Sequence, residues 1–211
     1  MNIQIHSLSK RFNKEWIFQS LTLDISSGQK IGVIGSNGSG KSTFIKLISG
    51  AELPSKGEIK YFNSKTEIDT AEIYSTINFT APYIDLIEEL SCKELINFHL
   101  QFKTFQNNLT DDAFIDLVYL KDAEHKFIKN FSSGMKQRLK LGLAICSQSQ
   151  LLLLDEPCSN LDTKGIELYH NLMDRYNQNR TTIIGSNEHK DELYKIEKTL
   201  RITDYKYGFE V

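Results

Sequence analysis

Nine consecutive residues form the segment of this chain with the clearest capacity for chemistry. The segment consists of Gly35, Ser36, Asn37, Gly38, Ser39, Gly40, Lys41, Ser42 and Thr43. Its glycines allow backbone angles that a Cβ would forbid, so successive N–H groups can close around an anion. Lys41 can reach the β- and γ-phosphates of a nucleotide, and the Ser42 hydroxyl can bind Mg²⁺. The spacing predicts a binding loop for a nucleoside triphosphate.

The residues on either side of this loop have the order that phosphate binding requires. The apolar run at residues 30–34 is typical of a buried strand, and residues 44–49 are typical of a helix that Gly50 ends. The helix N-terminus would add partial positive charge beside the phosphates. A plain glycine turn before a helix is the alternative. The glycine spacing, the Lys-Ser pair and the flanking elements together favour the nucleotide site.

A pair of carboxylates is the second candidate for chemistry. Asp155 and Glu156 directly follow the apolar run Leu151–Leu154, which is typical of a buried parallel strand. Open α/β sheets bind their ligands at the carboxyl ends of such strands. Asp155 could therefore hold Mg²⁺, and Glu156 could act as the general base that activates a water molecule. The pair could also simply begin a loop, but a phosphate loop in the same chain favours the functional interpretation.

Two further segments carry weaker signals. Phe12 and Trp16 could each offer a flat face to a purine base, or could be ordinary core or edge aromatics, and position alone does not choose. A polar turn at residues 131–134 leads into a helix expected at residues 135–147. It offers a second possible anion site, although Ser132 and Ser133 by themselves fit a helix N-cap equally well.

The pattern of elements predicts an α/β fold with a mostly parallel sheet, an N-terminal antiparallel part and an inserted helical part. Residues 1–30 alternate as antiparallel strands do, whereas residues 83–131 have helical spacing with a capping box from Ser91 to Glu94. We expect one domain over residues 1–211, with the helical subdomain at about 83–134. Other expected elements are strands at 58–62, 76–80 and 181–186, a helix at 163–177, core aromatics Phe98, Phe102 and Phe105, and a terminal hairpin formed by 200–203 and 207–211.

The composition of the 211 residues is that of an ordinary globular protein. The chain has 25 Lys and Arg against 27 Asp and Glu, a net charge of −2 and no basic block, which argues against nucleic acid as a partner. Its three cysteines, at positions 92, 146 and 158, have no metal-binding spacing and are expected to be reduced thiols. The N-terminus has no signal pattern, and no apolar run approaches the ~20 residues that span a bilayer. We expect a cytoplasmic protein.

Taken together, the motifs resemble those of one family, the nucleotide-binding domains of ATP-binding cassette (ABC) transporters. The resemblance covers essentially the whole chain. Residues 35–42 are similar to the Walker A motif and residues 151–156 to Walker B, while residues 159–162 resemble the D-loop. Residues 131–135 occupy the place of the family's Leu-Ser-Gly-Gly-Gln signature. Phe12 falls where the family stacks an aromatic ring on adenine, which favours it over Trp16.

The resemblance implies a function and a set of partners. ATP and Mg²⁺ would bind between two cassettes, in a homodimer or heterodimer, and closure would drive a separate integral-membrane permease from the cytoplasmic face of the membrane. Glu156 would activate water for ATP hydrolysis. Asp162 would join the subunits, and the partner copy would close the site with its signature residues Ser132, Ser133, Gly134 and Met135.

The chain departs from the family pattern in its signature and at two sensor positions. Ser133 replaces a glycine and Met135 a glutamine, Pro82 stands at the Q-loop glutamine, and Asn187 stands at the switch histidine. An asparagine can form hydrogen bonds to phosphate or water but cannot take up a proton near neutral pH. Nearby His189 is expected to lie on the surface. We expect a transport ATPase whose turnover is slowed or retuned, but not abolished, by the loss of the glutamine and the histidine. The alternative is an ATP-gated clamp, or the degenerate half of a heterodimer, with little hydrolysis.

Overall fold

The computed structural model describes residues 1–64 and 66–206, which form two compact units. The first unit contains residues 1–79, 149–156 and the segment from residue 179 onward. The second contains residues 80–148 and 157–178. The helical unit is therefore built from two chain segments. It extends beyond the expected 83–134, because the helix that follows Glu156 in the sequence belongs to it as well.

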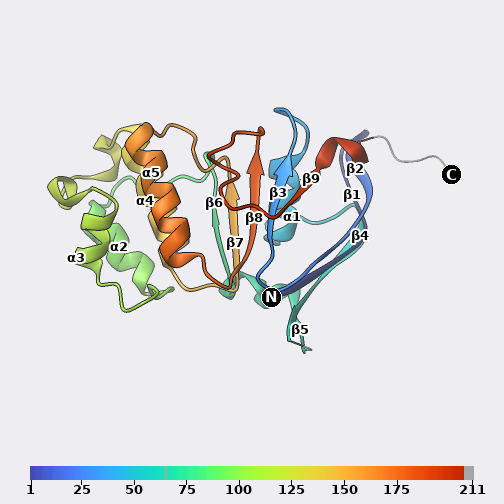
Figure 1. Ribbon diagram of the computed structural model, residues 1–211, viewed down its shortest axis with the longest axis horizontal. Coiled ribbons are helices and arrows are strands. Elements are labelled where there is room, and N and C mark those ends of the chain that lie inside the picture. Colours follow the sequence, from blue (N-terminus) through green and yellow to red (C-terminus); the bar gives the residue numbers. More distant parts are fainter. Residues whose placement is uncertain (65, 207–211) are drawn as a thin grey trace. The chain divides into compact units, whose positions relative to one another are not determined.

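An antiparallel sheet forms one part of the first unit (Figure 1). Its strand order is β2-β1-β4-β5, with β1 at Asn2–Phe12, β2 at Glu15–Ile25, β4 at Lys56–Asn63 and β5 at Thr66–Ile68. The alternation of apolar residues that predicted these strands puts Ile3, Ile5 and Leu21 in the core. The short strand β5 was not expected from the sequence.

A parallel sheet forms the other part of the first unit and positions the candidate site. Its order is β6-β7-β8-β3-β9, with β6 at Ile77–Thr80, β7 at Leu151–Asp155, β8 at Thr181–Ser186, β3 at Lys30–Ile34 and β9 at Lys198–Arg201. Strands β3 and β7 both pair in parallel with β8. The segments that follow these three strands therefore leave the sheet at one edge, with the end of β8 in the middle.

Helix α1, Lys41–Ile48, follows β3 and packs on β7 and β8. Its residues Phe44, Ile45 and Ile48 are completely buried against the apolar strands. The positive φ of Gly50 (74°) ends the helix as expected. Burial of this apolar face fixes the N-terminus of α1 next to the sheet edge where β3 ends.

Four α-helices lie in the described part of the second unit. They are α2 at Cys92–Leu100, α3 at Asp111–Leu117, α4 at Ser133–Cys146 and α5 at Thr163–Tyr176. The capping box at the start of α2 is confirmed: the Ser91 hydroxyl accepts from the Glu94 N–H, while the Glu94 carboxylate accepts from the Ser91 N–H. Helices α4 and α5 pack against each other. Among residues 1–64 and 66–206, every helix is too short or too polar to traverse a bilayer.

Two of the expected core aromatics are exposed, so that prediction was wrong. Phe98 is 43% exposed and Phe102 is 71% exposed, and their rings contact each other edge to face at 5.2 Å. Phe102 lies beyond α2, which ends at Leu100, whereas Phe98 lies within α2 but outside the face formed by its buried residues Cys92, Leu95 and Ile96. Phe105 is buried as expected and stacks on Phe114 of α3 at 4.5 Å.

The expected terminal hairpin is also incorrect where the structure describes it. Residues 198–201 form β9, which pairs in parallel with β3, and the chain then enters a 3₁₀ turn at Ile202–Tyr205. Within the described residues, β9 is an edge strand of the parallel sheet and pairs with β3, a partner far away in sequence. Residues 207–211, the other half of the expected hairpin, lie outside the described residues.

Candidate functional site

The loop from Gly35 to Thr43 connects β3 to α1 and depends on glycine for its path. Gly38 and Gly40 have φ values of 76° and 108°, in a region that other residues rarely occupy. A Cβ on Gly40 would also lie only 2.6 Å from Cγ2 of Ile17. The Ser39 N–H closes the turn on the Ser36 carbonyl at 3.1 Å. Glycine is therefore required by both the backbone angle and the close approach of β2.

Lys41, the first residue of α1, is only 4% exposed, and its ammonium group lies within the loop. Its Nζ donates to the carbonyl oxygens of Gly35 at 2.9 Å and Ser36 at 3.1 Å. It also donates to Oδ1 of Asn187, which follows β8. A buried positive charge is thus held at the end of β3 by neutral acceptors.

The two carboxylates differ in their surroundings. Asp155, the last residue of β7, is 1% exposed. Its carboxylate lies against Gly185 of β8, where a Cβ would come within 2.4 Å of Oδ1, so only glycine leaves the space it occupies. Glu156 is less buried and has a φ of 44°, with its N–H donating to the Gly185 carbonyl at 2.9 Å. Such a strained backbone in a residue other than glycine is typical of functional sites.

A cavity of about 290 Å³ brings the loop and Glu156 together. Its lining consists of Ile17, Asn37, Gly38, Gly40, Lys41, Ser42, Thr43 and Glu156. Ile17 was missed from the sequence, where it is only one apolar residue of an alternating strand. Its contact with Gly40 is the signal that assigns it to the site, and it offers an apolar wall beside the loop.

The two candidate aromatics lie at the end of the β1–β2 hairpin. Phe12 is 46% exposed and does not line the cavity, and Nζ of Lys10 is 4.7 Å from the centroid of its ring. Lys10 itself is anchored by Glu52 and by the Leu53 carbonyl. Trp16 is half-buried, with Arg11 and Lys56 over its ring. Phe12 is therefore the more accessible of the two rings.

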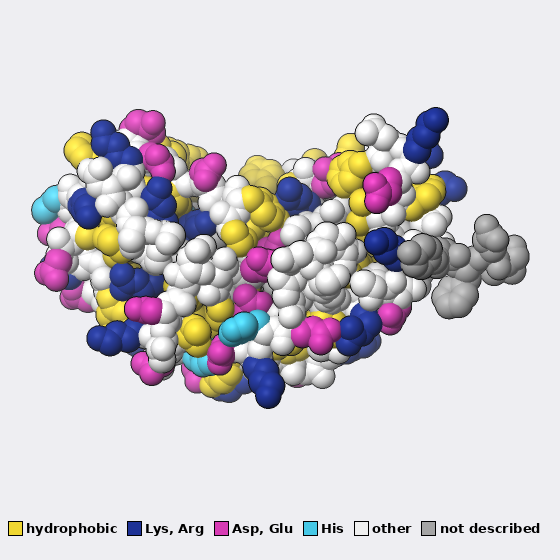
Figure 2. Space-filling view, turned by 90° about the horizontal axis from the view of Figure 1, so that it is seen from above, with side chains coloured by type: hydrophobic (Ala, Val, Ile, Leu, Met, Phe, Trp, Pro, Cys, Tyr) yellow, Lys and Arg dark blue, Asp and Glu magenta, His cyan; other side chains and the backbone are white. Residues whose placement is uncertain are grey.

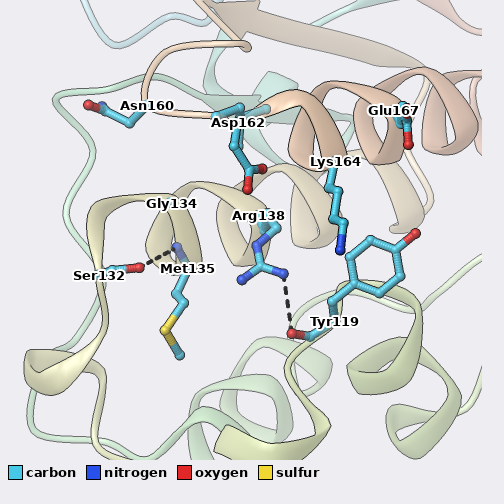
Figure 3. Close-up of a pocket in the computed structure, with 10 residues that line it drawn as sticks. Tyr119, Ser132, Gly134, Met135, Arg138, Asn160, Asp162, Lys164 and Glu167 are labelled. Atoms are coloured by element: carbon cyan, nitrogen blue, oxygen red, sulfur yellow. Dashed lines mark hydrogen bonds between the residues drawn. The ribbon is translucent and has the colours of Figure 1, made fainter.

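A separate cavity of about 640 Å³ in the second unit is lined by the predicted signature residues Ser132, Gly134 and Met135, though not by Ser133, and by D-loop residues that include Asp162. Figure 3 shows Ser132 and Met135 at the start of α4 and Asp162 at the start of α5, on the same wall of this cavity. Ser132 caps α4 by accepting from the Met135 N–H, and Asp162 caps α5 by accepting from the Gly165 N–H at 2.8 Å. Ser132 and Ser133 are both exposed. Two helix N-termini thus face one hollow that anions would favour.

The two sensor positions have different surroundings. Pro82 belongs to a turn in the second unit whose carbonyls, from Ala81, Pro82 and Ile84, all accept from Nζ of Lys140. Burial lowers the pKa of Lys140. Asn187 lies in the first unit with Lys41 and Glu156, and its Nδ2 donates to Glu156 Oε1 at 3.2 Å. His189 is on the surface, as expected.

Charged side chains of both signs are mixed on the face of the molecule that Figure 2 shows. Figure 2 shows lysine and arginine side chains interspersed with aspartate and glutamate over the visible face of each unit. This distribution matches the near balance of 25 basic and 27 acidic residues in the sequence.

Comparison with known proteins identifies the family. Residues 18–159 match the ABC transporter family. The chain is 29% identical over 204 residues to the uncharacterized ABC transporter ATP-binding protein YcbN of Bacillus subtilis, covering 95% of this chain and 66% of YcbN. It is 27% identical to YybJ of the same organism, covering 92% of this chain and 88% of YybJ.

Solved structures show the same fold. The structure of an ATP-binding subunit of an ABC transporter superposes with a TM-score of 0.80 at 20% identity, covering 96% of this chain and 87% of that one. A dimeric ATP-binding cassette bound to ADP and phosphate gives a TM-score of 0.78 at 19% identity, covering 95% of both chains. The expected α/β fold, with its antiparallel and parallel sheets, is confirmed.

The chain therefore belongs to the ABC transporter family. Within that family it is an ATP-binding cassette, the ATPase part that energises an ABC transporter.

Proposed function

We propose that this chain binds ATP with Mg²⁺ in the cavity beside α1 and hydrolyses it to ADP and phosphate to power a separate membrane-spanning permease. The convergence of Lys41, Ser42 and Glu156 on one cavity of the first unit carries this proposal. A buried cation, a glycine-rich loop and a carboxylate are what phosphoryl transfer needs, because positioning and electrostatics supply most of its catalysis.

Two residues, one at the start of α1 and one at the end of β7, fit a magnesium ion. Mg²⁺ prefers hard oxygen donors and is usually held by one or two carboxylates together with water and substrate phosphates. The Ser42 hydroxyl and the Asp155 carboxylate are donors of this type, and Gly185 leaves room for that carboxylate. When bound, Mg²⁺ neutralises phosphate charge. Lys41 would bind the β- and γ-phosphates, and the N–H groups of residues 36–43 would surround them.

Glu156 is the residue we assign as general base. Glu156 lines the cavity, and a carboxylate there can accept from a water molecule and orient it. Phe12 is proposed as the adenine platform, since its ring is accessible and Lys10 covers part of it. Ile17 would contact the nucleotide from the opposite strand of the hairpin.

The second cavity is proposed to act on the nucleotide of another cassette. Its two helix N-termini, capped by Ser132 and Asp162, are suited to closing over phosphate that a partner copy holds. The dimeric cassette among the similar structures supports such an assembly. We propose an ATP-dependent dimer, peripheral to the cytoplasmic face of a membrane through its permease.

Steady-state hydrolysis tests the proposed activity. Glu156→Gln keeps the size of the side chain but removes the base, so phosphate release should fall at least about a hundredfold, as expected for loss of a general base. Glu188→Gln is the matched control. Glu188 is exposed two residues from β8 and pairs with Arg201 at 2.8 Å, and it does not line the cavity. Equal rates for wild type and Glu156→Gln would contradict the proposal and favour a non-hydrolysing clamp.

A further inference from the structure

The side-chain amide of Asn187 connects three parts of the site within the first unit. Its Oδ1 accepts from Nζ of Lys41, while its Nδ2 donates to Asn37 Oδ1 at 2.6 Å and to Glu156 Oε1 at 3.2 Å. The orientation of the amide follows from its partners, because an ammonium group can only donate and an ionised carboxylate can only accept.

Lys41 has no donor left for a phosphate in this arrangement. An ammonium group has three N–H donors, and Nζ of Lys41 has three acceptors: the Gly35 carbonyl, the Ser36 carbonyl and Asn187 Oδ1. A phosphate oxygen must therefore replace one of them. The two carbonyls belong to the loop itself, whereas the Asn187 side chain is exposed and can move without disturbing the loop.

We propose that Asn187 is a latch that holds Lys41 when no nucleotide is bound and must release it before a phosphate can bind. The same amide keeps Glu156 and Asn37 attached to Lys41, so binding at the loop frees the general base at the same moment. The latch rests on the proposed function of this site, and it acts through Lys41 on the β-phosphate as well as on the γ-phosphate.

Neither a histidine nor an aspartate would make the same connection. The oxygen acceptor and the NH₂ donor of an amide are bonded to one carbon. One asparagine side chain can therefore accept from Lys41 and donate to Glu156 at the same time. The two nitrogens of an imidazole point in different directions, and a single nitrogen cannot accept from Lys41 while donating to Glu156. An aspartate would hold Lys41 more strongly as an ion pair but would repel Glu156.

Equilibrium binding of ADP tests the latch, because ADP contacts Lys41 but has no γ-phosphate. Asn187→Ala removes the competitor for Lys41, so the Kd for ADP measured by calorimetry with Mg²⁺ should fall about fivefold. Asn187→Asp strengthens the competitor, so the Kd should rise about fivefold. The control Glu188→Gln changes the adjacent exposed residue and should leave the Kd unchanged.

Each other result overturns the proposal. If Asn187 contacted only the γ-phosphate, wild type and Asn187→Ala would bind ADP with the same Kd. If Asn187 were needed only for structure, both Asn187→Ala and Asn187→Asp would bind ADP more weakly than wild type and would unfold at a lower temperature. If the wild-type chain bound neither ADP nor ATP, the proposed function itself would be wrong. Because the latch concerns affinity, its failure would leave the Glu156→Gln hydrolysis result intact.

Discussion

At the scale of single residues, His99 on α2 is half-buried and contacts both a hydroxyl group and an aromatic ring. Its Nε2 is 2.7 Å from the Ser147 hydroxyl, and its ring stacks on Phe105. Burial, with a smaller effect of the charge on Lys103, lowers the pKa of His99 to about 4. In the unfolded chain the pKa returns to about 6.5. The folded protein therefore keeps this ring neutral under conditions where the unfolded chain protonates it.

The pH dependence of stability should reveal this histidine. Since the folded pKa is depressed, its contribution is complete above pH 6.5 and is lost as pH falls toward 4. The loss should reach about 2 kcal/mol once partial exposure is allowed for. Denaturant unfolding between pH 7 and 4 should show a shallower decline in His99→Gln than in wild type. His125→Gln, at a side chain that is 79% exposed, should decline like wild type. Parallel curves for His99→Gln and wild type would contradict this account.

At the scale of elements, the contact of α4 with α3 depends on a glycine inside a helix. A Cβ on Gly142 would lie 2.5 Å from Cγ1 of Val118, just after α3, and 2.9 Å from the ring of Phe114. Alanine would improve the intrinsic helix propensity by about 1 kcal/mol. Overpacking a tight contact typically costs about 1–3 kcal/mol, and both neighbours here are fully buried. We expect the packing cost to exceed the gain in propensity.

Gly142→Ala should therefore lower the free energy of unfolding by about 1 kcal/mol. The measurement is denaturant unfolding of a double-mutant cycle with Val118→Ala, which removes the nearest methyl group. The double variant should be more stable than the sum of the two single effects. Two results would contradict this account: strictly additive effects of the two substitutions on the free energy of unfolding, or a Gly142→Ala variant more stable than wild type. Either would mean that α3 and α4 can move apart at no cost in free energy.

At the scale of the whole molecule, the two cavities belong to different units and carry complementary chemistry. The first holds the phosphate loop and Glu156, and the second presents two capped helix N-termini. If a complete site uses the first cavity of one copy and the second of another, each copy contributes to two sites. This arrangement can be tested by mixing variants that are each defective in one cavity.

Lys41→Ala and Ser132→Arg should each be inactive as homodimers. A mixed dimer would contain one intact site and one site with both defects, so an equimolar mixture should recover about a quarter of the wild-type ATPase rate. The control mixes Lys41→Ala with Glu156→Gln, whose defects lie in the same cavity, and should recover nothing. Light scattering of Glu156→Gln with ATP should show a dimer. A monomer there, or no recovery in the first mixture, would exclude a composite homodimeric site.

The sequence by itself predicted the α/β class, which is confirmed, and it located the glycine-rich loop between β3 and α1 and the acidic pair at the end of β7. These features are contiguous, and each carries its own flanking strand or helix, so local pattern is enough to define them. The expected capping box of α2 and most strands are confirmed for the same reason. Phe102 shows the limit of that reasoning, because helical spacing does not state where a helix ends, and Phe98 shows that spacing alone does not state which face of a helix is buried.

Only the tertiary structure decided which separate segments meet. The parallel pairing of β9 with β3 was not expected from the sequence, and the contact with Gly40 brought Ile17 into the site. Asn187 is 146 positions from Lys41 and 31 from Glu156, yet one amide joins them. They meet because β8 lies between β3 and β7, and parallel strands end at the same edge. Strand order is a property of long-range pairing, which no local sequence pattern encodes.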